Sequence, residues 1–106
     1  MGHAYLGEFE QNVLLAVWRH GDDAYGMRVR QEIEARTGRA VTIGAVYATL
    51  ERLAQKGCVR TSVGEPTAAR GGRAKRYYTI TRTGIAALDD ARNQLARMWQ
   101  GLPRRS

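Results

Sequence analysis

Hydrophobic side chains recur at helical spacing through the first half of the chain. Phe9 and Val13 lie one turn apart in residues 8–20, and residues 25–37 and 43–56 repeat the pattern. A glycine, the residue that most readily ends a helix, follows each of the three segments: Gly21, Gly38 and Gly57. The pattern predicts three successive helices.

Polar residues at the starts of these segments supply candidate helix caps. Asp22 or Asp23 is expected to cap the second helix and Thr42 the third, because short oxygen-bearing side chains accept hydrogen bonds from the first free amides. In the third helix, three side chains at helical spacing are expected to face the core: Val46, Leu50 and Leu53.

The period then changes from helical to alternating. Residues 58–63 and 76–80 alternate as β-strands do, and a long basic loop joins them. Tyr78 and Ile80 are expected on the core side of the second strand. On the first strand, one face is expected to carry Val59, Thr61 and Val63. The two segments predict a β-hairpin.

A last helix is predicted over residues 84–102, with Thr81 or Thr83 as its cap. It carries an apolar seam with steps close to a heptad: Ile85, Leu88, Leu95, Met98, Trp99 and Leu102. Beyond its first turns this helix has little left to cover, so a second copy of the chain is expected to bury the seam. The first helix is expected to share that dimer interface, whose candidate residues are Leu14, Trp18, Leu88, Leu95, Met98, Trp99 and Leu102.

The order of the elements indicates the fold class. Three helices, a hairpin with a basic tip and a final helix form a mainly α protein with a small β-hairpin. This is the layout of a winged helix-turn-helix domain, expected at residues 6–81, followed by a C-terminal dimerisation helix at 82–102.

Arginine dominates the charge of the chain. Its 106 residues include 17 lysines and arginines and carry a formal net charge of +7. Lys56 and Lys75 are the only lysines. Guanidinium groups bind phosphates and guanine edges through paired N–H donors. This composition favours nucleic acid, an anionic membrane or an acidic protein as the partner.

An enzyme is not expected from this sequence. His3 and His20 stand seventeen residues apart, and the acidic pairs at 22–23 and 89–90 consist of adjacent residues that diverge on a helix or turn. Neither arrangement has the spacing of a metal site or of a general acid/base pair. The lone cysteine, Cys58, is expected to be a small apolar core residue. No catalytic residue, metal or cofactor is therefore predicted.

The chain is expected to be cytoplasmic and without membrane contact. Its longest apolar run near the N-terminus, residues 13–18, is far too short to span a bilayer, and it lacks the basic flank and cleavage site of a signal peptide. A single cysteine also suits a reducing compartment.

Two segments are candidates for contact with double-stranded DNA. In a helix-turn-helix, the exposed start of the recognition helix meets base edges in the major groove. The candidates on the third helix are Thr42, Gly44, Ala45, Tyr47, Ala48, Thr49 and Arg52. The candidates in the loop of the hairpin are Arg70, Arg73, Lys75 and Arg76. Two alternatives remain: the small residues serve only helix packing, and the cations only keep the surface solvated.

Trp99 has two interpretations. It is an anchor of the dimer interface, or it forms one side of a site for a flat aromatic effector between two subunits.

The ordered motifs resemble those of the PadR family of bacterial transcriptional regulators. The resemblance runs from about Leu6 to Leu88 and rests on YG at 25–26, GAVYATLERLAQKG at 44–57 and GGRAKRYYTIT at 71–81. It implies a winged helix, a homodimer built by the C-terminal helix, repression at an operator and, in some members, release by aromatic small molecules. Ala48 and Ala74 stand where the family often has proline. The chain resembles the short branch with one C-terminal helix, which puts any effector site at the dimer interface.

The sequence thus predicts a homodimeric, sequence-specific DNA-binding repressor acting at a pseudo-palindromic operator. The alternative is a winged-helix module whose basic face docks an acidic protein partner, because this fold does not dictate its partner.

Overall fold

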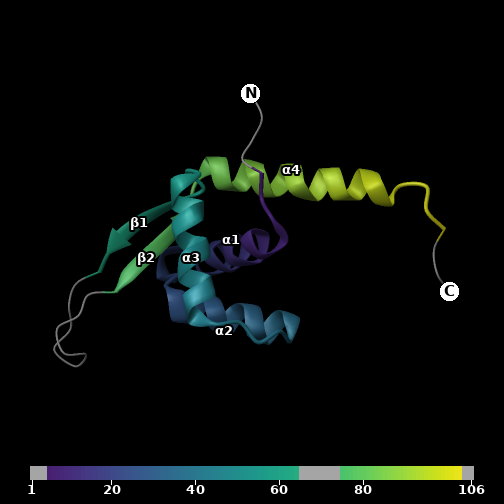
Figure 1. Ribbon diagram of the computed structural model, residues 1–106. Helices are drawn as coiled ribbons and strands as arrows, with labels where there is room; N and C mark the ends of the chain where they lie inside the picture. The colour runs from purple at the N-terminus through teal and green to yellow at the C-terminus, as the bar shows by residue number, and fades with distance from the viewer. Residues whose placement is uncertain (1–4, 65–74, 104–106) are drawn as a thin grey trace.

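A computed structural model describes residues 5–64 and 75–103 of the chain (Figure 1). Its elements, in order, are the helices and strands α1 (Glu8–His20), α2 (Gly26–Thr37), α3 (Ile43–Gln55), β1 (Val59–Val63), β2 (Arg76–Ile80) and α4 (Arg82–Trp99). A 3₁₀ turn, Gly21–Asp23, separates α1 from α2. The predicted order of three helices, a hairpin and a final helix is confirmed.

The Glu10 side chain stabilises the start of α1. The Gly7 amide donates a hydrogen bond of 2.9 Å to Glu10 Oε1, so the third residue of the helix closes its own first turn. The helix ends at Gly21, whose φ of +57° a side chain would disfavour. Acidic residues in the first turn and basic residues in the last complement the helix dipole.

The predicted cap of α2 was wrong. Asp22 and Asp23 belong to the 3₁₀ turn, and Tyr25 occupies the N-cap position in an extended conformation. Its end is as predicted, at Gly38 in the left-handed conformation with φ +73°.

α3 matches its prediction closely. The Thr42 hydroxyl accepts a hydrogen bond from the Ala45 amide at 3.1 Å, which caps the first turn. Val46, Leu50 and Leu53 are fully buried. Their side of α3 therefore faces α1 and α2, and the opposite side is left to solvent.

The hairpin is antiparallel, with Val59 opposite Ile80 and Val63 opposite Arg76. Tyr78 is buried as predicted, and its amide donates to the Ala24 carbonyl at 2.9 Å, which ties β2 to the turn before α2. The expected face of β1 is covered only at Val59. Val63 is 67 % exposed, because the hairpin extends beyond the helices that cover its base.

α4 is capped by Thr81, whose hydroxyl accepts from the Gly84 amide at 3.1 Å. A Cβ on Gly84 would lie 2.4 Å from the Cys58 carbonyl oxygen, so only glycine allows this approach of α4 to the start of β1. The helix thus leaves the hairpin directly and crosses over α1 (Figure 1).

One hydrophobic core joins all these elements. It includes Leu14, Val17 and Leu50, together with Ala87 and Leu88 from the first turns of α4. Cys58 is buried in it as predicted, and burial raises the pKa of its thiol. The later turns of α4 run past the bundle and end on the side opposite to the hairpin (Figure 1).

Candidate nucleic-acid interface

The outer side of α3 carries small side chains. Gly44, Ala45 and Ala48 are exposed over its first two turns, and Glu51 and Gln55 continue the same side. A Cβ on Gly44 would meet no atom within 4 Å, so the surface there is open. A partner can therefore approach the backbone of this helix closely.

Thr49 does not lie on this outer side, and the prediction that it is exposed was wrong. It is 1 % exposed, because it stands one turn from both Val46 and Leu53 and shares their inward direction. Its hydroxyl accepts a hydrogen bond from Arg52 Nη2 at 3.2 Å. Thr49 thus has a role inside the domain and offers no methyl group to an external partner.

Arg52 lies at the edge of the outer side of α3, and one edge of its guanidinium group faces Glu10 of α1. Its Nε is 3.5 Å from Glu10 Oε2 of α1, and its side chain is 54 % exposed. Glu10 also accepts from Lys56 Nζ at 2.9 Å to each of its oxygens. Burial by itself would raise the pKa of Glu10, but the Lys56 and Gly7 hydrogen bonds and the nearby Arg52 outweigh it and lower that pKa.

Tyr47 packs its ring over the start of α2. A Cβ on Gly26 would lie 2.5 Å from Cε1 and Cζ of the Tyr47 ring and 2.7 Å from its hydroxyl oxygen. The ring nevertheless remains 48 % exposed. Tyr47 therefore packs the hydroxyl end of its ring against the first turn of α2, while about half of the side chain stays exposed. The sequence did not reveal that Gly26 makes room for this ring.

Aromatic rings and cations meet where the hairpin joins α2. Tyr25 and Tyr77 form an edge-to-face pair with centroids 5.8 Å apart. Lys75 Nζ lies 3.9 Å from the Tyr25 ring centroid, and the Arg28 guanidinium 5.3 Å from it. Arg28 first and Lys75 second hold the pKa of the Tyr25 hydroxyl below its ordinary value.

The predicted hairpin cations are only partly within the described residues. Arg76 is exposed at the start of β2, while Lys75 is half-buried by its stacking on Tyr25. Arg70 and Arg73 lie outside the described residues. β1 contacts α3, and the hairpin runs alongside that helix (Figure 1), so the outer side of α3 and the hairpin form adjoining surfaces.

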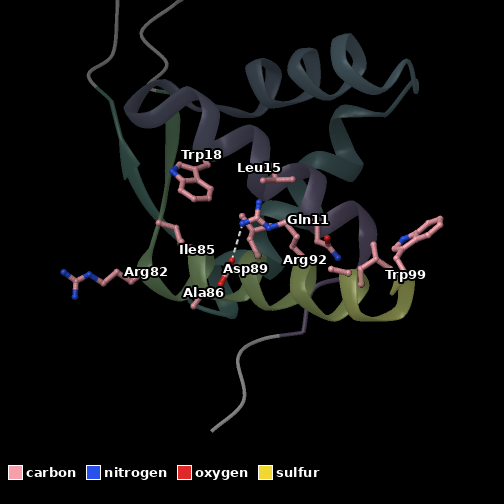
Figure 2. A pocket seen from close by; sticks show the side chains of 12 residues that line it. Gln11, Leu15, Trp18, Arg82, Ile85, Ala86, Asp89, Arg92 and Trp99 are labelled. Atoms are coloured by element: carbon pink, nitrogen blue, oxygen red, sulfur yellow. Dashed lines mark hydrogen bonds and ion pairs between the residues drawn. The ribbon is translucent and has the colours of Figure 1, made fainter. Parts of the chain in front are cut away.

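A second exposed surface lies between α1 and α4, as an open groove of about 740 Å³. Figure 2 shows Leu15 and Trp18 on the α1 side and Ile85, Arg92 and Trp99 on the α4 side. α4 ends at Trp99, three residues before its predicted end. Its last turns add exposed apolar side chains, with exposed fractions of 60 % for Leu95, 75 % for Met98 and 65 % for Trp99, and Leu102 just beyond the helix is 58 % exposed.

One of the predicted interface residues does not reach this surface. Leu14 is fully buried in the core, whereas Leu88 is only 7 % exposed but lines the groove. Leu15, which the sequence analysis did not select, is 44 % exposed next to Trp18. The run Val13–Trp18 is apolar throughout, so no polar residue marks where the core side of α1 ends.

Within residues 5–64 and 75–103, no three histidine, cysteine or acidic side chains come together as a metal site would require. In the same part of the chain, none of the helices combines the length and apolar character needed to cross a bilayer.

Comparison with known proteins agrees with the fold. A transcriptional regulator from Clostridium thermocellum superposes with a TM-score of 0.71 at 22% identity, over 86% of this chain and 85% of that one. A PadR-like transcription factor from Bacteroides fragilis superposes with a TM-score of 0.72 at 21% identity, over 85% of this chain and 82% of that one. A PadR family transcription regulator from a hypervirulent Clostridium difficile superposes with a TM-score of 0.70 at 17% identity, over 87% of this chain and 91% of that one.

No curated protein matches the chain. The family model described as the transcriptional regulator PadR-like family matches residues 14–90, which include α2, α3, both strands and the first half of α4. The matched region holds the outer side of α3 and the base of the hairpin. This chain, a winged helix-turn-helix protein, belongs to the PadR-like family of transcriptional regulators.

Proposed function

We propose that this chain is a sequence-specific DNA-binding repressor that acts as a homodimer on a pseudo-palindromic operator. One observation carries the proposal: an open helix side of small residues adjoins a basic hairpin in a chain of net charge +7. Small side chains let the backbone of a recognition helix enter the major groove, and a basic wing follows the phosphates beside it. The proposed contacts on α3 are Thr42, Gly44, Ala45, Tyr47, Ala48 and Arg52.

The hairpin would hold the phosphate backbone or enter the minor groove. Arg76, at the loop end of β2, is exposed, and Lys75 stacks on the Tyr25 ring, which the Arg28 guanidinium also approaches. Arg70 and Arg73 extend the same proposal to the loop. These cations would add affinity for any duplex, because phosphate contacts do not distinguish sequences.

The homodimer would be built by α4 and the residues that follow it up to 102, with help from α1. Leu95, Met98 and Trp99 of α4 and Leu102 just after it are exposed, and Leu95 and Trp99 line the same groove as Trp18 of α1. So many exposed large apolar side chains in one place are typical of a surface that another protein covers. Two-fold symmetry of the dimer would then place the DNA half-sites about one helical turn, or a multiple of it, apart.

The groove between α1 and α4 is a candidate effector site. With Trp18 and Trp99 among its lining residues, it would bind a flat aromatic molecule between the subunits. The test uses a Trp18→Phe protein, in which Trp99 is the only tryptophan. Quenching of its fluorescence by members of a diverse panel of planar aromatics is expected, and no response across the panel would argue against the site.

The function itself is tested by selecting bound sequences from a random duplex pool and then comparing variants on the selected duplex. The double change Arg73→Ala, Arg76→Ala is expected to weaken binding to every duplex, by about tenfold or more. A pool without any enriched sequence, or equal affinity of the double variant and the wild type, would instead indicate an acidic protein as the partner.

A further inference from the structure

Glu10 is the most buried carboxylate among the described residues. It is 8 % exposed, in the first turn of α1, and it faces the last turns of α3. One partner, Lys56, also donates from Nζ to the Tyr5 carbonyl at 2.6 Å. Glu10 therefore links the segment before α1 to the end of the proposed recognition helix.

The other partner, Arg52, is held on one edge of its guanidinium group. Nε faces Glu10 Oε2 at 3.5 Å, and Nη2 donates to the buried Thr49 hydroxyl at 3.2 Å. Among the described residues, no hydrogen bond is found for Nη1. The guanidinium thus has one edge fixed by the domain and the other free for an external acceptor.

This arrangement changes what Arg52 can recognise. An unrestrained arginine on the surface turns toward any phosphate within reach and adds affinity for all sequences alike. A guanidinium fixed on one edge presents its free N–H groups in one direction, which suits a single acceptor in a single register. The Glu10 carboxylate also repels a polyanion, so it disfavours any binding mode that leaves Arg52 without a good acceptor.

We propose that Glu10 is a specificity-determining positioning residue: with Thr49 it holds Arg52 in one orientation and withholds it from non-specific phosphate contacts. This rests on the proposed function, because it assigns Arg52 to the DNA-facing edge of α3. Glu10 itself touches no DNA in this account and acts through Arg52.

The test is Glu10→Gln, compared with wild type on the selected operator and on a scrambled duplex of the same length. Glutamine can still accept from the Gly7 amide and close the first turn of α1, while the charge that holds Arg52 is lost. Affinity for the scrambled duplex is expected to rise about three- to tenfold, since one more phosphate contact forms per subunit. Affinity for the operator is expected to change less, so the ratio of operator affinity to scrambled-duplex affinity falls.

Glu8→Gln is the matched control. It removes the same charge from the same turn, at a side chain that is 83 % exposed and lies 3.6 Å from Arg39. It is expected to leave the operator-to-scrambled ratio within about twofold of wild type, because it does not touch Arg52. Equal effects of the two variants would reduce the role of Glu10 to bulk charge and overturn the proposal.

A second test places Glu10→Gln in an Arg52→Ala background, where the change should no longer alter the ratio. A ratio that still falls there would overturn the proposal, as would a Glu10→Gln protein that melts earlier but discriminates like wild type. If the wild-type protein binds no duplex at all, the proposed function fails and this inference with it. If wild type binds and Glu10→Gln keeps its ratio, only the role of Glu10 is refuted.

Discussion

The outer side of α3 and the end of α4 are both exposed, but their chemistry differs. α3 presents Gly44, Ala45 and Ala48, which leave the helix backbone accessible. α4 presents Leu95 and Trp99 and neighbouring large apolar side chains, which gain most from being covered. The outer side of α3 therefore suits a partner that approaches the helix backbone closely, and the end of α4 suits an apolar partner surface that excludes water from it.

The largest effect is expected from a charge on the apolar surface. Leu95→Asp should weaken the dimer by about 100-fold or more, because a carboxylate buried without a partner is strongly unfavourable. Light scattering at micromolar protein concentration measures the mass in solution and so distinguishes monomer from dimer. Asn93→Asp, on the opposite, exposed side of α4, is the control and should remain dimeric. A Leu95→Asp protein of unchanged mass would refute this assignment of the interface.

The next effect concerns the surface of small residues. Ala48→Glu should weaken binding to the selected duplex by about tenfold or more, since a carboxylate would face the phosphates. The thermal midpoint should hardly move, because Ala48 is exposed. Ala35→Glu on the exposed side of α2 adds the same charge elsewhere and should bind nearly as wild type does. Equal binding by both variants would exclude this side of α3 as the DNA contact.

A smaller effect is expected at the contact between α2 and α3. Gly26→Ala should displace the Tyr47 ring, because the new methyl group would lie within 2.5 Å of it. DNA affinity should fall about three- to tenfold if the Tyr47 hydroxyl contacts a phosphate. In a Tyr47→Ala background the same change should have no further effect on affinity. A full additional loss there would show that Gly26 acts by another route.

The smallest effect is on stability in acid. The pKa of Glu10 is lowered in the folded state, so its contribution to stability is present above the ordinary glutamate pKa and is lost as the pH falls through the folded value. Between about pH 5 and pH 3, the free energy of unfolding should fall less steeply for Glu10→Gln than for wild type. Parallel pH profiles would contradict the ion pairs with Lys56 and Arg52.

The order of the elements and most of their bounds could be predicted from the sequence, because periodicity, caps and glycines agree at most junctions; the cap of α2 and the two ends of α4 were not. The rotation of the helices could not be predicted as well. Thr49 lies next to Leu50, and Leu14 next to Leu15, and a shift of one residue on a helix turns a side chain by 100°. Where apolar or ambiguous residues run together, only packing against the neighbouring elements decides which one is exposed.

Contacts between distant residues were also beyond the sequence. Glu10 and Arg52 are forty-two positions apart, and the room that Gly26 leaves for Tyr47 depends on how α2 and α3 cross. The sequence also could not show which hairpin cation packs against another side chain. Lys75 is one of four similar residues in the sequence, but it is half-buried on Tyr25 in the structure.

The salt dependence of binding to the selected operator tests the central claim most directly. A dimer that neutralises three to four phosphates per subunit should give a slope of log affinity against log salt concentration of about −6. Such a slope would support binding of DNA by the paired α3 helices and hairpins. A slope near zero would contradict it, because a surface that relies on its cations for contact with phosphates cannot be insensitive to salt.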